Sequence, residues 1–184
     1  MHFFKNLELK KKKILLFFII SIFLSFLIDS KLTLFFYGLN EPFKSFFHTV
    51  TKFGDSLYYL LFIALFFLIL RVRKNISPIF KNLYDLNVFI FYNIILSGVV
   101  TQILKHLIGR PRPKMLLLDH DSLDLNLFTF NSSFHSFPSG HTSTIFSIVF
   151  VFYFLFPGIK KYIISAGIFI ALTRLIIGAH YLSD

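Results

Sequence analysis

Three short polar blocks interrupt an otherwise apolar sequence and contain the residue types that an anion site requires. They are Lys105 with Arg112-Pro113, then Pro138-Ser139-Gly140-His141, then Arg174 with His180 and Asp184. Transfer of a phosphoryl group concentrates negative charge on its equatorial oxygens, so catalysis needs positioned cations and an in-line nucleophile. Three cations, two imidazoles and one carboxylate meet that need. The blocks therefore predict a pocket that binds a phosphate group and attacks it.

The second block predicts an anion cradle, because it opens an apolar stretch that we expect to be helical. A helix N-terminus presents free backbone N–H groups and the positive end of the helix dipole. Gly140 would let the backbone approach an anion closely, and the hydroxyl of Ser139 would donate a further hydrogen bond. The alternative is an ordinary Pro/Ser helix start in which His141 has no chemical role.

The third block predicts an imidazole oriented by a carboxylate. His180 and Asp184 are four residues apart and would share one face if the preceding helix continued through them. The carboxylate would fix the tautomer of the imidazole and stabilise its cation, with a surface ion pair as the alternative. His141 supplies a second imidazole. One ring could then attack phosphorus while the other protonates the leaving oxygen.

The three cations differ in how strongly their positions in the sequence indicate a functional role. Arg174 interrupts the apolar stretch 168–177, and an arginine at the centre of a bilayer costs about 2.5–3.5 kcal/mol on insertion scales. We therefore expect Arg174 to face a partner inside the protein. For Lys105 and Arg112 the alternative is snorkelling of a long side chain at the membrane edge.

A metal site is the competing use of the histidines. His135, His141 and His180, with aspartates of the loop between the first two blocks, could in principle bind zinc. No pair of them has the spacing of a helical metal site, and three nearby cations would oppose a divalent ion. The sequence therefore predicts neither a metal nor another cofactor.

The composition places these blocks in a membrane protein. The 184 residues are 55% hydrophobic and their mean hydropathy is +0.72, which is too apolar for a soluble domain of this size to bury in one core. The net charge is +10, but the basic residues cluster at the ends of apolar stretches, so no nucleic-acid partner is predicted. The absence of cysteine excludes disulfides and thiolate metal sites.

Five apolar segments predict an all-α fold, a multi-pass bundle of transmembrane helices. They are 14–28, with a continuation to 36 left open, 57–70, 88–108, 142–156 and 159–178. A helix needs about 20 residues to cross the hydrocarbon core, so the second and fourth segments need their polar flanks to complete a span. Lys10–Lys13 before the first segment are typical of a secretory signal, but no small-x-small cleavage site follows. We therefore expect an uncleaved first span.

The basic residues predict a cytoplasmic N-terminus. Eleven of the 19 lysines and arginines then lie inside: Lys5, Lys10–Lys13, Arg71, Arg73, Lys74, Lys81, Lys160 and Lys161. Three of those outside belong to the polar blocks and have another reason to be there. All three blocks then emerge on the same outer face. The long polar segment 109–137 becomes an external loop that covers the site or contacts a lipid headgroup.

Together the blocks resemble the signature of the type 2 phosphatidic acid phosphatase family, the lipid phosphate phosphatases whose site is shared with vanadium haloperoxidases. The family pattern is Lys, six residues, Arg-Pro; then Pro-Ser-Gly-His; then Ser-Arg, five residues, His, three residues, Asp. This sequence has that order and spacing from Lys105 to Asp184, with Thr173 in place of the serine. The exchange keeps the hydroxyl and should be mild. The likeness extends in helix layout to most of the chain.

The resemblance implies a role for each matching residue. His180 would be the nucleophile that forms a phosphohistidine, Asp184 would orient it, and His141 would protonate the leaving group and then deprotonate water. The phosphate would be held by Lys105, Arg112, Ser139, Gly140 and Arg174. The family has a sixth span after the final aspartate. We therefore expect residues 1–184 to be a single membrane-embedded domain, incomplete at the C-terminus, with Asp184 on a frayed backbone.

The sequence thus predicts a metal-independent phosphatase that acts on a lipid or polyisoprenoid phosphate or diphosphate at the outer face of a membrane, taken as a bacterial inner membrane. Phosphatidic acid, phosphatidylglycerol phosphate, undecaprenyl diphosphate and a lipid A phosphate all fit. Two alternatives stay open. One is an inactive or truncated relative that binds anionic lipid or a partner, and the other is a small transporter whose pathway is lined by Arg174.

Overall fold

The structure, a computed structural model, describes residues 2–72, 77–118 and 121–184, and the regular secondary structure in these ranges is helical. The α-helices are α1 His2–Tyr37, α2 Glu41–Val50, α3 Ser56–Val72, α4 Pro78–Ile108, α5 Gly140–Leu155 and α6 Lys160–Ile176. Short 3-10 helices are η1 Thr51–Gly54, η2 Pro113–Leu118, η3 Ser132–Phe134 and η4 Pro157–Ile159. No strand occurs in these three ranges. The predicted all-α class is confirmed.

Each predicted apolar segment falls largely within a helix, and the structure adds one helix that the sequence analysis missed. The first helix does not stop at Ile28 but continues through Asp29 to Tyr37. The additional helix is α2, where the side chain of Asn40 caps the N-terminus by accepting a hydrogen bond from Phe43 N at 3.2 Å. Its phenylalanines alternate with polar residues over only 10 positions, so it lacks a long apolar stretch.

The predicted number of spans stays a prediction. Two segments are long and apolar enough to cross a membrane alone, Lys11–Tyr37 and Pro78–Leu118. Two helix pairs qualify only together, Glu41–Gly54 with Ser56–Arg71 across a 43° bend and Gly140–Leu155 with Pro157–Ile176 across a 118° bend. Helices α3, α5 and α6 have 17, 16 and 17 residues, just below the length of about 20 that a span requires. Length and composition therefore support two to four spans among the described residues, where the sequence predicted five.

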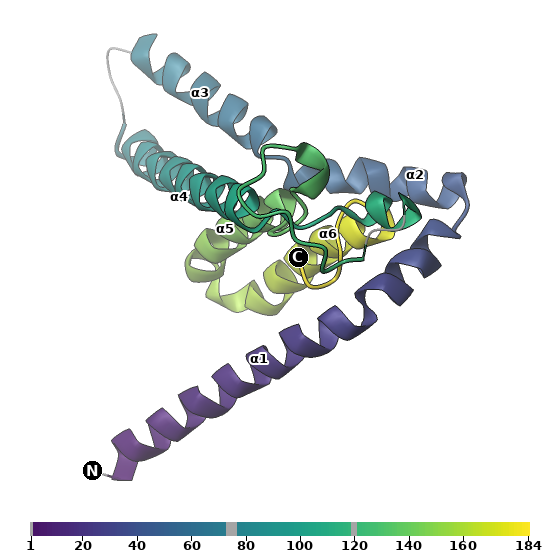
Figure 1. Cartoon of the computed structure of the whole chain (residues 1–184). Coiled ribbons are helices and arrows are strands. Elements are labelled where there is room, and N and C mark those ends of the chain that lie inside the picture. Colours follow the sequence, from purple (N-terminus) through teal and green to yellow (C-terminus); the bar gives the residue numbers. More distant parts are fainter. Residues whose placement is uncertain (1, 73–76, 119–120) are drawn as a thin grey trace.

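Helix α5 lies at the centre of the bundle, packed against α4 and α6, while α1 extends away from them toward the N-terminus (Figure 1). Ile63 of α3, Ile94 of α4 and Ile148 of α5 form a small apolar core. At Gly167 the helices α5 and α6 approach so closely that a Cβ would lie 2.6 Å from Val149 Cγ2. This packing brings the end of α4, the start of α5 and the end of α6 to the same region, where the three polar blocks lie.

The loop between α4 and α5 is folded back on itself. Gly109 ends α4 in the left-handed conformation (φ 58°), and a Cβ there would lie 1.6 Å from Asn126 O, so only glycine fits. Backbone hydrogen bonds then join the two ends of the loop, from Ser136 N to Arg110 O at 3.0 Å and from Arg112 N to Ser133 O at 2.8 Å. These contacts place the Arg110–Arg112 segment beside the start of α5. Arg73, Lys74 and Asp119, used in the sequence analysis, lie outside the described residues.

Candidate active site

His180 and Asp184 meet in a turn rather than on a helix. The prediction of one helical face is wrong, because α6 ends at Ile176 and Gly178 adopts φ 67°. The carbonyl of Arg174 accepts hydrogen bonds from the N–H groups of Ala179 (2.9 Å) and His180 (3.2 Å), which closes the helix. The turn nevertheless forms the predicted contact, with His180 Nδ1 at 3.2 Å from Asp184 Oδ2.

Burial sets the charge state of this pair. The His180 side chain is 3% exposed, and burial lowers its pKa below the ordinary value although Asp184 opposes the shift. Burial alone would raise the pKa of Asp184, but the hydrogen bond from His180 and the charge of Arg110 outweigh it and hold the pKa below the usual value. At neutral pH the pair is therefore a neutral imidazole and a carboxylate. Because the carboxylate only accepts, Nδ1 carries the proton and Nε2 carries the lone pair.

Asp184 is not frayed, contrary to the expectation from the sequence. Its carboxylate is fully buried and accepts hydrogen bonds from Arg110 Nη1 (2.5 Å), Ser136 Oγ (2.5 Å) and Tyr181 N (2.9 Å), besides the contact with His180. The backbone is held too, since Asp184 O accepts from Ser139 N at 3.1 Å. This last contact joins the third polar block to the second.

The second block forms the N-terminus of α5, as predicted. Ser139 is the N-cap, and its Oγ accepts from Thr142 N at 3.4 Å, which leaves the hydroxyl proton free to donate. Within the described residues, the backbone N–H groups of Gly140 and His141 donate no hydrogen bond. The 3-10 helix η1 packs against His141. A Cβ at Gly54, the last residue of η1, would lie only 3.0 Å from His141 Cβ.

Lys105, Arg112 and Arg174 form what we call the cation cluster. Their charges act on one another, and within the described residues none of the three forms an ion pair with a carboxylate. Arg174 Nη1 donates to Thr51 Oγ1 at 3.2 Å while its buried Nε has no partner, and Arg112 Nε donates to Ser132 O at 3.0 Å. Lys105 Nζ lies 3.9 Å from the place where a Cβ on Gly140 would be. The donors of the cluster are thus mostly unused by the protein.

The predicted site residues line two cavities. One has a volume of about 130 Å³ and is lined by Ser139, Arg174, His180 and Asp184 together with apolar side chains. The other, about 280 Å³, is lined by Arg112, Lys114, Ser132, Gly178 and Ala179. Lys105 and His141 line neither cavity. Both nevertheless interact electrostatically with His180. Arg112 therefore approaches the other two cations from the side of Gly178.

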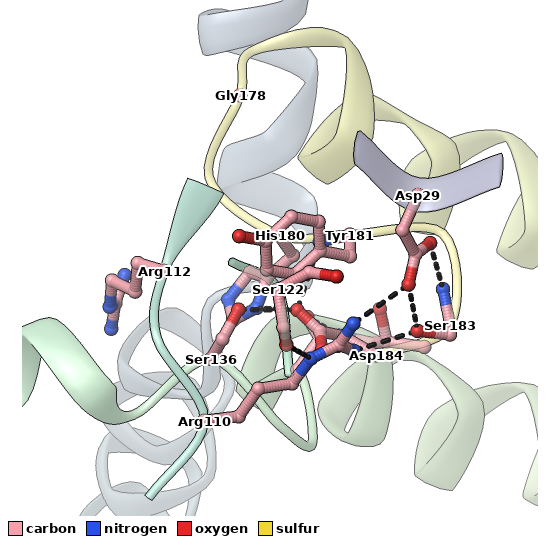
Figure 2. Close-up of polar contacts among 12 residues, drawn as sticks. Asp29, Arg110, Arg112, Ser122, Ser136, Gly178, His180, Tyr181, Ser183 and Asp184 are labelled. Atoms are coloured by element: carbon pink, nitrogen blue, oxygen red, sulfur yellow. Dashed lines mark hydrogen bonds and ion pairs between the residues drawn. The ribbon is translucent and has the colours of Figure 1, made fainter. Parts of the chain in front are cut away.

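Sequence reasoning missed four residues that contact Asp184 or one another: Asp29, Arg110, Ser136 and Ser183. Together with Asp184 they form what we call the carboxylate network (Figure 2). Arg110 is 1% exposed and pairs with Asp29 at 2.7 Å and with Asp184 at 2.5 Å. The signal that could have revealed it is Asp29, a carboxylate within an apolar stretch, to which the sequence analysis gave no role. In the part of the chain that is described, no three His, Cys, Asp or Glu side chains are grouped so as to hold a metal ion.

Comparison with known proteins agrees with the motif. Residues 87–184, more than half of the chain, match the PAP2 superfamily. Lipid A 1-phosphatases from Rhizobium johnstonii and Rhizobium etli are each 32% identical, over 151 and 143 residues that cover 78% and 73% of this chain. The chain spans 61% and 60% of the length of these relatives.

Two solved structures share the fold. The crystal structure of Aquifex aeolicus LpxE is 25% identical with a TM-score of 0.55, and the match covers 85% of each chain. The transmembrane PAP2 type phosphatidylglycerolphosphate phosphatase from Bacillus subtilis is 21% identical with a TM-score of 0.53, over 90% of this chain and 85% of that one. The resemblance predicted from the motif is confirmed: this chain belongs to the PAP2 superfamily.

Proposed function

We propose that this protein is a membrane phosphatase that hydrolyses a lipid phosphate through a phosphohistidine on His180. One observation carries the proposal: a neutral imidazole held by a buried carboxylate lines the same cavity as Arg174 and the N-cap of α5. The imidazole is the nucleophile that such a reaction needs, and the positive groups around it suit a phosphate.

In the first half-reaction, the lone pair of His180 Nε2 attacks phosphorus. The N–P bond forms as the P–O bond to the lipid breaks, and the departing oxygen takes a proton from His141, which would carry that proton while the phosphate anion is bound. In the second half-reaction, His141 accepts a proton from water, the new O–P bond forms, and the N–P bond breaks. Inorganic phosphate leaves and His180 is neutral again. Asp184 supports both steps by accepting the Nδ1–H hydrogen bond, which stabilises positive charge on the ring.

The cation cluster and the start of α5 would stabilise the charge on the phosphoryl oxygens. Lys105, Arg112 and Arg174 supply positive charge, and the unused N–H groups of Gly140 and His141 form the positive end of the dipole of α5. The hydroxyl of Ser139 adds a donor. The positive charge and the free hydrogen-bond donors of these groups support an anionic phosphate ester as the substrate class.

Among lipid phosphates, a lipid A 1-phosphate is the first substrate to test, because the curated relatives named above are lipid A 1-phosphatases. An apolar cavity of about 710 Å³ supports a substrate with hydrocarbon chains. Phe53, Ile63, Ile90 and Ile148 are among its lining residues, and it adjoins η1, the element that packs against His141. We place the enzyme in a bacterial inner membrane with its site at the outer face.

The activity is tested by release of inorganic phosphate from a short-chain lipid phosphate by the purified chain in detergent. We expect release that resists EDTA and is blocked by vanadate, and that His180→Ala abolishes. His48→Ala is the matched control, because His48 is exposed on α2, outside the site. A His180→Ala variant as fast as the parent would refute the nucleophile assignment. Lipid binding without any release would instead favour an inactive relative.

The orientation needs a separate experiment. A reporter fused after Lys81, which precedes most of α4, should be found in the cytoplasm if the polar blocks face outward. Detection of that reporter outside would place the candidate site on the cytoplasmic face.

A further inference from the structure

All three guanidinium nitrogens of Arg110 donate hydrogen bonds to protein groups, whereas the donors of the cation cluster are mostly free. Nε donates to Ser122 O (3.0 Å), Nη1 to Ser183 Oγ (2.7 Å) and Asp184 Oδ1 (2.5 Å), and Nη2 to Asp29 Oδ2 (2.7 Å). Its guanidinium carbon lies 4.8 Å from the ring centroid of Phe26 and 4.4 Å from that of Tyr181. Each of the three guanidinium nitrogens thus donates within the protein, and four of the five N–H donors are used there.

Asp29 is the partner on the opposite side of Arg110. Asp29 is 0% exposed, whereas most of the side chains described on α1 are exposed. Oδ2 accepts from Arg110 and from Ser183 Oγ, and Oδ1 accepts from Ser183 N at 3.2 Å. Figure 2 shows Arg110 between Asp29 and Asp184, with Arg112 turned away from the group. A charged side chain buried in an apolar helix is unfavourable unless it is paired, so this pairing fixes the place of α1.

The geometry at Asp184 gives the network a consequence for His180. The two carboxylate oxygens have different partners, because Oδ1 accepts from Arg110 while Oδ2 accepts from Ser136, Tyr181 N and His180. With Oδ1 held by Arg110, the carboxylate cannot rotate without breaking a buried ion pair. Oδ2 therefore stays opposite Nδ1 of the imidazole.

We propose that Arg110 is a positioning residue that aligns Asp184 on His180, and that Asp29 of α1 in turn aligns Arg110. This inference rests on the proposed function, in which His180 is the nucleophile. It assigns a role at the site to α1, which precedes the matched residues 87–184. It also gives different roles to Arg110 and Arg112. Arg112 would face the phosphate, and Arg110 faces the carboxylate of Asp184.

The network also predicts opposite electrostatic effects for the loss of Arg110 and the loss of Asp29. The charged and titratable groups that act on His180 are Asp184 from its own turn, Arg174 of α6, Lys105 of α4 and His141 of α5. Loss of the Arg110 charge leaves Asp184 less neutralised, so His180 would bind its proton more tightly. Loss of the Asp29 charge leaves the positive charge of Arg110 compensated only by Asp184. The surroundings of His180 then become more positive, so His180 would bind its proton less tightly. A purely structural network would give neither shift.

The test compares Arg110→Gln and Asp29→Asn with the parent for kcat and for the pH at half-maximal activity on the acid side. We expect kcat to fall about 10- to 100-fold for Arg110→Gln and less for Asp29→Asn, by analogy with groups that orient a catalytic ligand. The acid limb should move to higher pH in Arg110→Gln and to lower pH in Asp29→Asn. Arg71→Gln, an exposed arginine at the end of α3, is the matched control and should change neither.

Unshifted acid limbs, with activity lost only in proportion to folded protein, would overturn the proposal. Asp29→Asn keeps the size of the side chain, so it tests the inference even where Arg110→Gln does not fold. A second readout separates this inference from the proposed function. Nitrogen-15 NMR of labelled histidines, with His180 assigned by its loss in His180→Ala, reports tautomer and titration without any turnover. If the parent releases no phosphate, the proposed function fails, while opposite shifts of His180 titration in the two variants would still uphold the positioning role and equal titration would refute it.

Discussion

The carboxylate network and the cation cluster adjoin the same histidine but differ in how their charges are satisfied. In the network, Arg110 lies between two fully buried carboxylates at 2.7 Å and 2.5 Å. In the cluster, three positive side chains lie near one another without a carboxylate partner in the described residues. Each charge of the network thus has a partner of opposite sign within the protein, whereas the cluster pairs with no described carboxylate. Two adjacent groups of charged residues can thus have different roles, one in holding a geometry and the other in receiving a substrate.

This difference predicts that substitutions in the two regions affect stability and activity differently. Removing one member of a buried ion pair leaves an uncompensated charge and typically costs about 3–5 kcal/mol of folding stability. Removing one cation from a cluster of like charges relieves repulsion, so folding should not suffer. Activity should fall in both cases.

The largest effect is expected for Asp184→Asn. The amide cannot keep the Nδ1 proton of His180 in place as a carboxylate does, so kcat should fall about 10³- to 10⁴-fold, as when the orienting aspartate of a catalytic triad is changed. Because Arg110 also loses a partner, the melting temperature should fall. Phosphate release and a thermal melt in detergent measure the two effects. An Asp184→Asn protein that melts like the parent would remove the stabilising role assigned to the network.

The cluster is tested by Arg174→Met, which removes the charge at similar length. Loss of one donor to the transition state should lower kcat about 10²- to 10³-fold. The melting temperature should stay equal or rise, because the buried Nε has no partner and only one hydrogen bond, to Thr51, is lost. A marked fall in melting temperature would show that Arg174 stabilises the fold, and the distinction between the two regions would then be lost.

The sequence revealed the cluster and missed the network for a physical reason. Lys105, Ser139, Gly140 and Arg174 stand in short motifs at the ends of apolar stretches, where local spacing predicts which face they reach. The pair of Asp29 with Arg110 joins positions 81 apart in the sequence, and no local pattern connects them. A buried pair of this kind depends on how α1 packs, which apolar composition leaves undetermined.

The fold also contains features that local sequence predicts and features that it does not. The long apolar stretches predicted helices correctly, because a continuous run of apolar residues is a local property. The turn at 177–184 was not predicted, because it depends on Gly178 adopting a positive φ and on the carbonyl of Arg174 accepting two N–H groups. Helix α2, capped by Asn40, was missed since its apolar residues are few.

An intermediate effect is expected from pH. Burial lowers the pKa of His180 and the pKa of Asp184 is also below its usual value. A group with a depressed pKa contributes stability that is present above its unfolded value and lost as pH falls through its folded value. Acid should therefore destabilise the protein from about pH 6.5 downward, where the unfolded histidine begins to bind protons.

The same shift sets the acid limb of activity. The neutral form of His180 is the nucleophile, so kcat should reach half its maximum below pH 6.5 and then fall about tenfold per pH unit. Together with His141 this should give a bell-shaped profile from two coupled imidazoles. Initial rates of phosphate release between about pH 4 and 9 measure it. An acid limb centred above pH 6.5 would contradict the neutral state assigned to His180 in the network.

The smallest effect is expected for Gly140→Ala at the start of α5, beside the cation cluster. The added Cβ would meet only Lys105 Nζ, at 3.9 Å, which is ordinary contact, so the melting temperature should not fall. The methyl group would nevertheless stand between the start of α5 and the ammonium group, where the phosphate is proposed to bind. KM and the inhibition constant of vanadate should therefore rise a few-fold with little change in kcat. Gly158→Ala is the matched control, because nothing lies within 4 Å of its Cβ. Equal vanadate inhibition in Gly140→Ala and Gly158→Ala would mean that the anion does not approach this part of the cluster, and that Arg112 and Arg174 bind it from the other side.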